Sequence, residues 1–274
     1  MPAAQLRLLV VLPAILLAGC GPDRRDAMPL LPDIHNRPWT IVEDAPIRGN
    51  VARRQIALVF TGGDFGEGAK AILDQLAERG IQASFFVTGD FLRQPALASP
   101  LRRMLRDGHY LGPHSHAHLL YCSWEDRSRT LVTERVFVED LRRNIDELRK
   151  LGALAADDQP VYFIPPYEWY NREQSAWARR MGVLLFNFTP GSGSNRDWAP
   201  EGHKSFVPST QIVDDILAFE RKDPNGLNGF ILLLHLGSQR QDKMHPHVGR
   251  LIDALRDRGY AFIRIDQMLP TAEG

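Results

Sequence analysis

The alternation of apolar runs with amphipathic stretches constrains the fold more than any other feature of this 274-residue chain. Strands that alternate with helices form parallel sheets, because each helix returns the chain to the edge where the previous strand began. At this length a closed or nearly closed barrel is the economical arrangement, and an open doubly wound sheet is the alternative. Seven runs have strand character: Gln55–Phe60, Ala83–Thr88, Tyr110–Pro113, Val161–Pro165, Val183–Phe188, Phe230–His235 and Ala261–Ile265.

Segments with helical periodicity lie between these runs. In the first helical segment Ile72, Leu73 and Leu76 fall on one face. Glycines 80, 108, 152, 182 and 259 follow five of the segments, where a residue of left-handed conformation commonly ends a helix. The expected helices are Ala69–Arg79, Ala98–Asp107, Val138–Leu151, Arg172–Met181, Gln211–Arg221 and His247–Arg258.

Composition limits the class of partner. Hydrophobic residues make up 44% of the chain and charged residues 24%, which is typical of a globular protein rather than a disordered one. Lys plus Arg and Asp plus Glu balance at 33 each, so no net charge attracts the protein to nucleic acid or to an anionic surface. We therefore expect a neutral partner such as a sugar and no nucleic acid.

The first twenty residues predict an export signal. Arg7 precedes the apolar run Leu8–Leu17, which is shorter than the ~20 residues that a membrane span needs. Leu17–Cys20 resembles the bacterial lipoprotein box, so Cys20 is the expected lipidation site of a membrane-anchored protein facing the periplasm or the cell surface. An ordinary cleaved signal or an N-terminal anchor is the alternative.

The remaining chain divides into a tether and one domain. Residues 21–53 contain five prolines and no sustained period, which indicates a tether, and the catalytic domain is expected over residues 54–270. Cys122 would be the remaining thiol of the mature chain, and we expect it to be buried and inert.

Polar residues follow the predicted strands where each one ends. The carboxyl ends of parallel strands meet at one rim, where ligands bind in barrels and in open sheets alike. The residues expected there are Asp64 and Glu67 after the first strand, His114, His116 and His118 after the third, Tyr167 to Tyr170 after the fourth, Asp197 and Trp198 after the fifth, and His235 on the sixth.

His114 and His118 predict a metal site. Imidazoles four positions apart can point at one ion, while His116 would point elsewhere as a bystander. Asp64 is the natural third ligand, and a shell of two histidines and one carboxylate leaves positions open for water and substrate. The alternatives are a histidine-rich surface turn and, for Asp64, a turn residue that bonds its own loop.

Other rim residues have possible roles in catalysis and in binding. His235 could protonate a leaving group near neutral pH, or it could be a hydrogen-bonded core histidine. Flat aromatic faces at strand ends stack on sugar rings, although such residues also cap cores. The candidates for substrate binding are Tyr167, Trp169, Tyr170 and Trp198.

Five segments, in order, resemble motifs of the polysaccharide deacetylase family, which is carbohydrate esterase family four and includes the nodulation-factor deacetylases. The resemblance covers about residues 54–267. The segments are Gln55–Phe60 with its loop to Gly68, the histidine pair His114-Ser115-x-x-His118, Phe163-x-Pro165-Pro166-Tyr167, the pair Asp197-Trp198, and Leu233-Leu234-His235.

The resemblance implies a distorted (β/α)7 barrel of parallel strands with outer helices. It further implies hydrolysis of N- or O-acetyl groups on a glycan with one divalent metal, commonly zinc. By the same resemblance His114 and His118 are metal ligands and His235 is the general acid. Asp197 would orient His235, and Tyr167 would lie in the segment whose backbone amide holds the oxyanion.

The chain departs from the family pattern at two positions. Family members carry adjacent aspartates after the first strand, a base and a ligand, whereas this chain has one displaced aspartate, Asp64. They also carry an arginine where this chain has Ile164. In the family this arginine pairs with the aspartate that acts as the base. The loss of both members of that ion pair together is physically coherent, because an unpaired buried charge is costly.

A replacement base is therefore needed, and the candidates are Glu168, Glu67 and Asp64. Glu168 is slightly preferred, because it follows the proline-proline-tyrosine element directly. Glu67 could instead be a carboxylate in the first turn of a helix, and Asp64 could serve as both ligand and base. The leading hypothesis is an exported, metal-dependent glycan deacetylase. The alternatives are a glycan-binding lipoprotein on a catalytically altered barrel and a hydrolase of a non-glycan amide.

Overall fold

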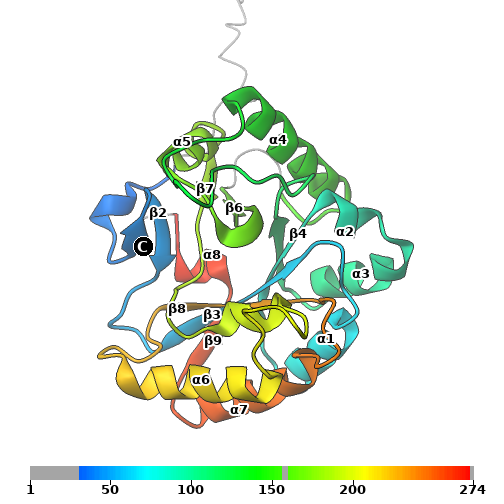
Figure 1. Cartoon of the computed structure of the whole chain (residues 1–274), viewed down its shortest axis with the longest axis vertical. Coiled ribbons are helices and arrows are strands. Elements are labelled where there is room, and N and C mark those ends of the chain that lie inside the picture. Colours follow the sequence, from blue (N-terminus) through cyan, green and yellow to red (C-terminus); the bar gives the residue numbers. More distant parts are fainter. Residues whose placement is uncertain (1–30, 156–159, 272–274) are drawn as a thin grey trace, which may run out of the picture.

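The computed structural model describes residues 31–155 and 160–271 and contains all seven predicted strands (Figure 1). Four of them form the centre of a parallel sheet in the order β8-β3-β4-β5, and β6 and β7 form a separate parallel pair. Their bounds are β3 Gln55–Gly62, β4 Ser84–Val87, β5 Tyr110–Pro113, β6 Val161–Phe163, β7 Val183–Leu185, β8 Phe230–His235 and β9 Ala261–Ile263.

The prediction of an α/β fold with a parallel, curled sheet is confirmed, with one distortion between β5 and β6. Side chains join these two strands: the Tyr162 N–H donates to Tyr110 Oη at 2.9 Å, and His114 Nδ1 donates to the Ile164 carbonyl at 2.9 Å. Strand β9 pairs with β3 only along Gln55–Ala57. Because β8 occupies one edge of β3, β9 shares the other edge with β4.

The prediction of a tether over residues 21–53 is wrong for its described part. Strands β1 (Thr40–Val42) and β2 (Ala45–Arg48) form an antiparallel pair, and β2 pairs with β8 at Arg48 and Phe230. The Asn187 N–H, just after β7, donates to the Pro46 carbonyl at 3.0 Å. Strand β2 therefore connects the β7 side of the barrel to β8, and one barrel strand is antiparallel.

Tertiary contacts, rather than local sequence preference, stabilise strand β2. The buried Arg48 guanidinium donates to the carbonyls of Asn228 and Gly226 at 2.9 and 2.8 Å and lies 3.4 Å from Asp223. A four-residue strand containing proline has no period that a sequence can reveal. The signal peptide, Cys20 and the first part of the tether lie outside the described residues.

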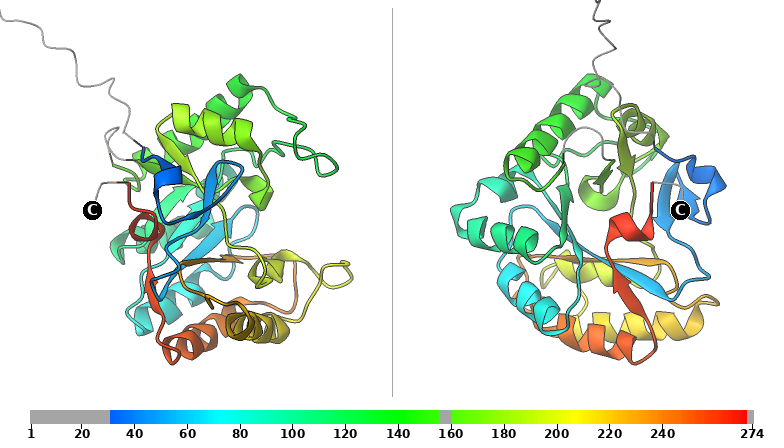
Figure 2. Two further views of the ribbon diagram at one scale, coloured as in Figure 1. Left: turned by 90° about the vertical axis from the view of Figure 1, so that its left-hand side faces the viewer. Right: turned by 180° about the vertical axis from the view of Figure 1, so that it is seen from behind.

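Helices surround the sheet (Figure 2, right). All six predicted helices form, and all five predicted terminal glycines have positive φ, between 63° and 84°. No helix in the described ranges is long and apolar enough to cross a membrane. The helices are α1 Ala69–Glu78, α2 Gly89–Arg93, α3 Ala98–Arg106, α4 Glu134–Lys150, α5 Arg172–Arg180, α6 Ser209–Lys222, α7 Val248–Arg256 and α8 Ile265–Met268.

Alternation along β3 and β8 directs side chains to two different cores. Ile56, Leu58 and Phe60 pack with the outer helices, whereas Ala57 and Val59 belong to the core inside the barrel. The same parity places Thr61 at the end of β3 and His235 at the end of β8 on the inner side, and the two are register partners. The strand period thus places His235 at the inner mouth of the barrel.

Candidate active site

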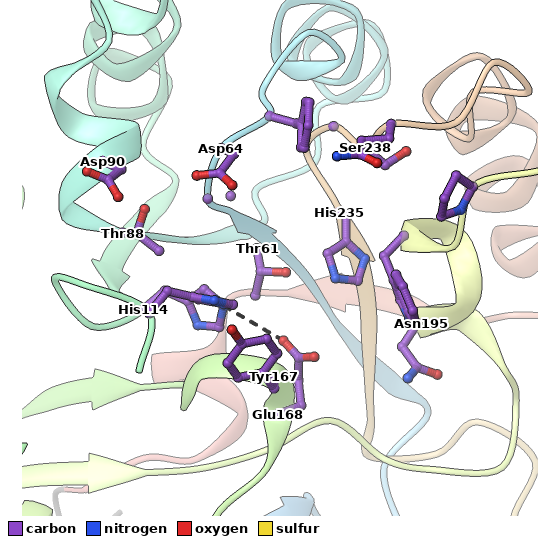
Figure 3. Close-up of a pocket in the computed structure, with 18 of the residues that line it drawn as sticks. Thr61, Asp64, Thr88, Asp90, His114, Tyr167, Glu168, Asn195, His235 and Ser238 are labelled. Carbon is purple, nitrogen blue, oxygen red and sulfur yellow. Dashed lines mark ion pairs between the residues drawn. The ribbon is translucent and has the colours of Figure 1, made fainter. Parts of the chain in front are cut away.

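A cavity of about 1050 Å³ opens at the carboxyl ends of the strands (Figure 3). Its lining comes from the loops after β3, β4, β5, β6, β7 and β8, as the rim prediction requires. The sequence-predicted residues that line it are Asp64, His114, His118, Tyr167, Glu168, Trp198 and His235.

Hydrogen bonds to neighbouring elements fix the two predicted histidine ligands. The His114 N–H lies within hydrogen-bond distance of both the Val87 carbonyl and Asn144 Oδ1. The Nδ1–H of His114 donates to the Ile164 carbonyl, which leaves Nε2 with a lone pair for a ligand. His118 has φ 52°, and its N–H donates to Ser115 Oγ at 2.9 Å. The two imidazole centroids are 5.0 Å apart.

Both imidazoles are held in the neutral form. Burial lowers the pKa of His118 to about 4, although the charge of Asp64 opposes the shift. Burial also lowers the pKa of His114 well below its usual value, and the neighbouring His118 adds to this effect. A neutral imidazole is the form that binds a metal, so the pair is ready to act as ligands near neutral pH.

His116 points away from this pair, as predicted. Arg93 donates to His116 Nε2 at 3.0 Å, and His116 Nδ1 lies 3.2 Å from Glu147 Oε2. Arginine can only donate, so Nε2 accepts and Nδ1 carries the proton. The N–H groups of His116 and Ala117 both donate to the carboxylate of Asp140 on α4. His116 is thus no ligand, but it anchors the histidine loop to α2 and α4.

The prediction that Asp64 completes a three-residue metal shell is not met. Asp64 lines the cavity but is exposed, two residues beyond the end of β3. Among the described residues, no three His, Cys, Asp or Glu side chains gather closely enough to hold an ion. Figure 3 shows Asp64 entering the pocket from the loop after β3, on the side opposite Glu168.

His235 and Asp197 form the predicted pair. His235 Nδ1 donates to Asp197 Oδ1 at 2.7 Å, and the His235 N–H donates to Oδ2 at 2.8 Å. Asp197 is 2% exposed and lies in the 3-10 helix η5 (Ser194–Trp198). Burial alone would lower the pKa of His235, but the charge and hydrogen bond of Asp197 outweigh it and raise the pKa. Nε2 of His235 is left to act as a proton donor.

Glu168 is the carboxylate that reaches the centre of the cavity. It lies in the 3-10 helix η4 (Pro166–Glu168), where Tyr167 and Glu168 have φ 58° and 53°. Asn187 Nδ2 donates to the Glu168 carbonyl at 2.7 Å and so fixes this unusual backbone. Oε1 is 3.9 Å from His114 Nε2, and burial raises the pKa of Glu168 to about 7. A base of this pKa suits a reaction at neutral pH.

Glu67 is not available as a base, which corrects the second candidate. Its carboxylate binds Lys243 Nζ at 2.5 Å and the Ser238 N–H at 3.1 Å, and so joins the loop before α1 to the loop after β8. Burial alone would raise the pKa of Glu67, but Lys243 and Ser238 hold it below its usual value. Glu67 does not line the cavity.

The four predicted aromatic residues separate into two groups. Tyr167 and Trp198 are exposed and line the cavity, as expected. Tyr170 is fully buried and donates to the Val42 carbonyl at 2.9 Å, so its prediction as a substrate-binding residue is wrong. Trp169 does not line the cavity and instead stacks against Trp124. Tyr167 and Glu168 face the cavity whereas Trp169 and Tyr170 do not, and sequence alone did not establish this division.

Trp124 and Thr61 are among the lining residues that sequence reasoning missed. Trp124, in the loop before α4, is 55% exposed, and a tryptophan within the polar stretch Ser123–Arg129 was a usable signal. Thr61 is 2% exposed, and its buried hydroxyl has no hydrogen-bond partner. Nothing in the sequence distinguished Thr61 from other strand-end threonines.

The fold and the cavity define a class: barrel proteins with histidines and carboxylates at the carboxyl ends of the strands. The family model for polysaccharide deacetylases matches residues 48–186, and the chain belongs to this family. It is 22% identical over 227 residues to a peptidoglycan-N-acetylglucosamine deacetylase of Bacillus cereus, covering 82% of this chain and 72% of that protein.

Solved structures share the fold. A family 4 carbohydrate esterase of Bacillus subtilis superposes with a TM-score of 0.64 at 22% identity, covering 82% of this chain and 85% of that one. A protein of Bacillus anthracis described as a pseudoenzyme of the same esterase family gives 0.60 at 17% identity, covering 84% and 70%. The expected distorted barrel is therefore confirmed, with β2 as its antiparallel member.

Proposed function

We propose that this protein is a metal-dependent hydrolase that removes acetyl groups from a polysaccharide outside the cytoplasm. One observation carries the proposal: a single cavity brings together two neutral imidazoles, a carboxylate with a pKa of about 7 and a histidine paired with a buried aspartate. Family membership supports the deacetylation, and the named activity of the Bacillus cereus relative supports an acetylated amino-sugar polymer as the substrate.

His114 and His118 fit a divalent metal, because the hydrogen bond from His114 Nδ1 to Ile164 leaves its Nε2 free and burial keeps both rings neutral. Asp64 lines the same cavity and its charge acts on the His118 ring, but it does not gather with the two histidines, so His114 and His118 are the residues that would hold the ion. The ion, which we propose to be zinc, would polarise the acyl carbonyl and make water more acidic.

The protein's own groups would handle the protons. Glu168 would accept a proton from the attacking water, and His235 would donate one to the departing amine or alcohol. Asp197 would accept a hydrogen bond from His235 Nδ1 and stabilise the protonated imidazolium, whose Nε2 proton is the one donated. The backbone N–H of Tyr167 would assist at the oxyanion, and the exposed rings of Tyr167 and Trp198 would contact the sugar.

The test compares two glutamates in acetate release from acetylated oligosaccharides and cell-wall glycan by metal-loaded protein. Glu168→Gln should lower kcat by about 10²–10⁴-fold because the base is lost. Glu67→Gln, the matched control outside the cavity, should retain most of the activity. His118→Ala should abolish acetate release. Absence of release across a broad acetylated panel, or equal losses for the two glutamine variants, would contradict the proposal.

A second candidate function is glycan binding without turnover. Thr61 and Gly62 end β3, after which the family has its two aspartates, and Asp64 does not gather with the histidines. The barrel also occurs in the protein described as a pseudoenzyme, so the fold does not decide between the two functions. Measurable glycan affinity together with no acetate release at any metal loading would favour this candidate.

The proposed location follows from the N-terminal sequence. We propose that Cys20 carries the lipid anchor and that the domain faces the periplasm or the cell surface. Cys20→Ser should move the protein from the membrane fraction to the soluble exported fraction. Unchanged membrane association would contradict lipidation at this residue.

A further inference from the structure

We propose that Arg240 is a positioning residue for the Asp197–His235 pair, because its guanidinium joins the loop that carries Asp197 to the loop that follows His235. This inference rests on the proposed function, in which His235 is the acid. Arg240 is 1% exposed and does not line the cavity, so it acts only through other residues. Figure 3 shows His235 near Asn195 of η5 and Ser238 of the loop after β8, and all three line the cavity.

The buried guanidinium of Arg240 is hydrogen-bonded through all three of its nitrogens. Its acceptors, at 2.7–3.3 Å, are the carbonyls of Arg196, Ala199, Val207 and Asp242, together with Ser209 Oγ and Asp242 Oδ2. The Phe206 ring lies 4.6 Å from Arg240 Cζ. A guanidinium has five N–H groups in one rigid plane, whereas the ammonium of lysine has three. Lysine could therefore not satisfy this set of acceptors.

Two of these acceptors lie on either side of Asp197 in the chain. Arg240 Nη1 donates to the Arg196 carbonyl at 3.3 Å and to the Ala199 carbonyl at 3.1 Å. The Ala199 N–H also donates to the Arg196 carbonyl at 3.2 Å and closes the last turn of η5. Arg240 thus holds the same turn from outside. Because Asp197 lies within this turn, its carboxylate moves whenever the turn moves.

The Asp197–His235 pair depends on the alignment of two separate elements. His235 ends β8, whereas Asp197 lies in η5 after β7. Asp242 adds to the connection that Arg240 makes between them: the Ser209 N–H donates to Asp242 Oδ2 at 2.6 Å, and the Ser209 hydroxyl donates to the Asp242 carbonyl at 3.0 Å. The loop after β8 is therefore fixed to the segment between η5 and α6. Without Arg240, the buried part of this connection is lost.

The proton affinity of His235 is sensitive to this alignment. Burial lowers the pKa of His235, whereas the charge and hydrogen bond of Asp197, followed by the charge of Glu168, raise it. The other ionisable groups that interact with His235 are His114 and His118, which are neutral near pH 7. A hydrogen bond weakens steeply when its length or angle departs from the optimum. Displacement of Asp197 should therefore let burial dominate and lower the pKa of His235.

Arg48 offers a matched control, because it is the other buried arginine in the described ranges. Its guanidinium also donates to two carbonyls, those of Asn228 and Gly226, and lies 3.4 Å from Asp223. These contacts are at β2 and do not involve η5. Arg48→Lys should therefore destabilise the fold as Arg240→Lys does, without affecting the Asp197–His235 pair.

The experiment measures the titration of His235 by histidine-selective NMR of zinc-loaded protein, with the signal identified by its loss in His235→Gln. Acetate release gives kcat and the pH dependence of kcat/KM. Arg240→Lys should move the His235 midpoint and the alkaline limb to lower pH and lower kcat roughly 10–100-fold. Arg48→Lys should lower Tm and leave these readouts as in wild type. On the Asp197→Asn background, Arg240→Lys should add little, since both substitutions act through one carboxylate.

A second variant, Asp242→Ala, decides the test if Arg240→Lys does not fold. It removes one partner of the guanidinium from a partly exposed position, so the His235 midpoint should move in the same direction by less. An unmoved midpoint in folded Arg240→Lys, or in Asp242→Ala where the first variant does not fold, overturns the proposal. Equal shifts in Arg240→Lys and Arg48→Lys also overturn it. The titration needs no turnover, so a protein that never releases acetate contradicts the proposed function alone.

Discussion

At the scale of single residues, unusual backbone conformations concentrate at the candidate site. Six non-glycine residues in the described ranges have positive φ, and four of them are Ser115, His118, Tyr167 and Glu168, at 52–68°. A non-glycine residue in this conformation costs about 1 kcal/mol or more of folding free energy, and contacts with its surroundings must offset this cost. Here hydrogen bonds from Asn187 to the Glu168 carbonyl, and to Asp140 from the backbone of the histidine loop, hold these conformations. Unfavourable backbone conformations are thus concentrated in the two loops that carry His118, Tyr167 and Glu168 into the cavity.

Asp197→Asn tests the role assigned to the His235 pair. Because Asp197 raises the pKa of His235, its loss should lower that pKa and remove the fixed tautomer. His235 must be protonated to act as an acid, so activity falls as pH rises through its pKa. We expect kcat to fall about 10²–10⁴-fold and the alkaline limb of kcat/KM to move to lower pH. A pH profile with an unmoved alkaline limb would rule out this coupling.

At the scale of elements, the predicted strands and helices formed wherever the chain has a clear period. The exceptions are short elements that depend on partners: β1, β2, α2 and α8, the longest of which has five residues. Strand β2 contains Pro46, and its place in the sheet comes from Phe230 and Asn187, far along the chain. Local sequence preference could not indicate contacts that exist only after the barrel closes.

Shortened chains test whether β2 belongs to the barrel. A chain beginning at residue 54 loses the buried Ile34 and Ala45 and the hydrogen bonds of Arg48. Burial of one isoleucine is worth about 2 kcal/mol and each hydrogen bond about 1 kcal/mol. We expect Tm to fall by roughly 10 °C in calorimetry. A chain beginning at residue 31 is the control and should melt as the full chain does.

At the scale of the whole molecule, buried neutral histidines couple stability to pH. Burial lowers the pKa of His109 to about 4, and its Nδ1 accepts a hydrogen bond from the Ala83 N–H at 3.0 Å. The unfolded chain binds this proton near pH 6.5, so between pH 6.5 and 4 it holds more protons than the folded chain. The contribution of His109 to stability is therefore present above pH 6.5 and lost as pH falls toward 4.

His109→Asn measures that contribution, since the asparagine oxygen can still accept from Ala83. Urea unfolding of both proteins at pH 7 and pH 4 should show the wild type losing about 3 kcal/mol more than the variant on acidification. Parallel losses in the two proteins would mean that His109 is protonated in the folded state.

Period and composition, which act over a few residues, sufficed to predict the strand order along the chain, the helix ends and the residue types at the rim. The motif residues indicated the family. Tertiary contacts decided which glutamate can serve as the base, because Glu67 binds Lys243 whereas Glu168 is buried in the cavity 3.9 Å from His114 Nε2. They also decided that Tyr170 is buried, that Trp124 is exposed beside the site, and that β2 is a strand. Each of these depends on contacts between segments distant in the sequence, which no local pattern encodes.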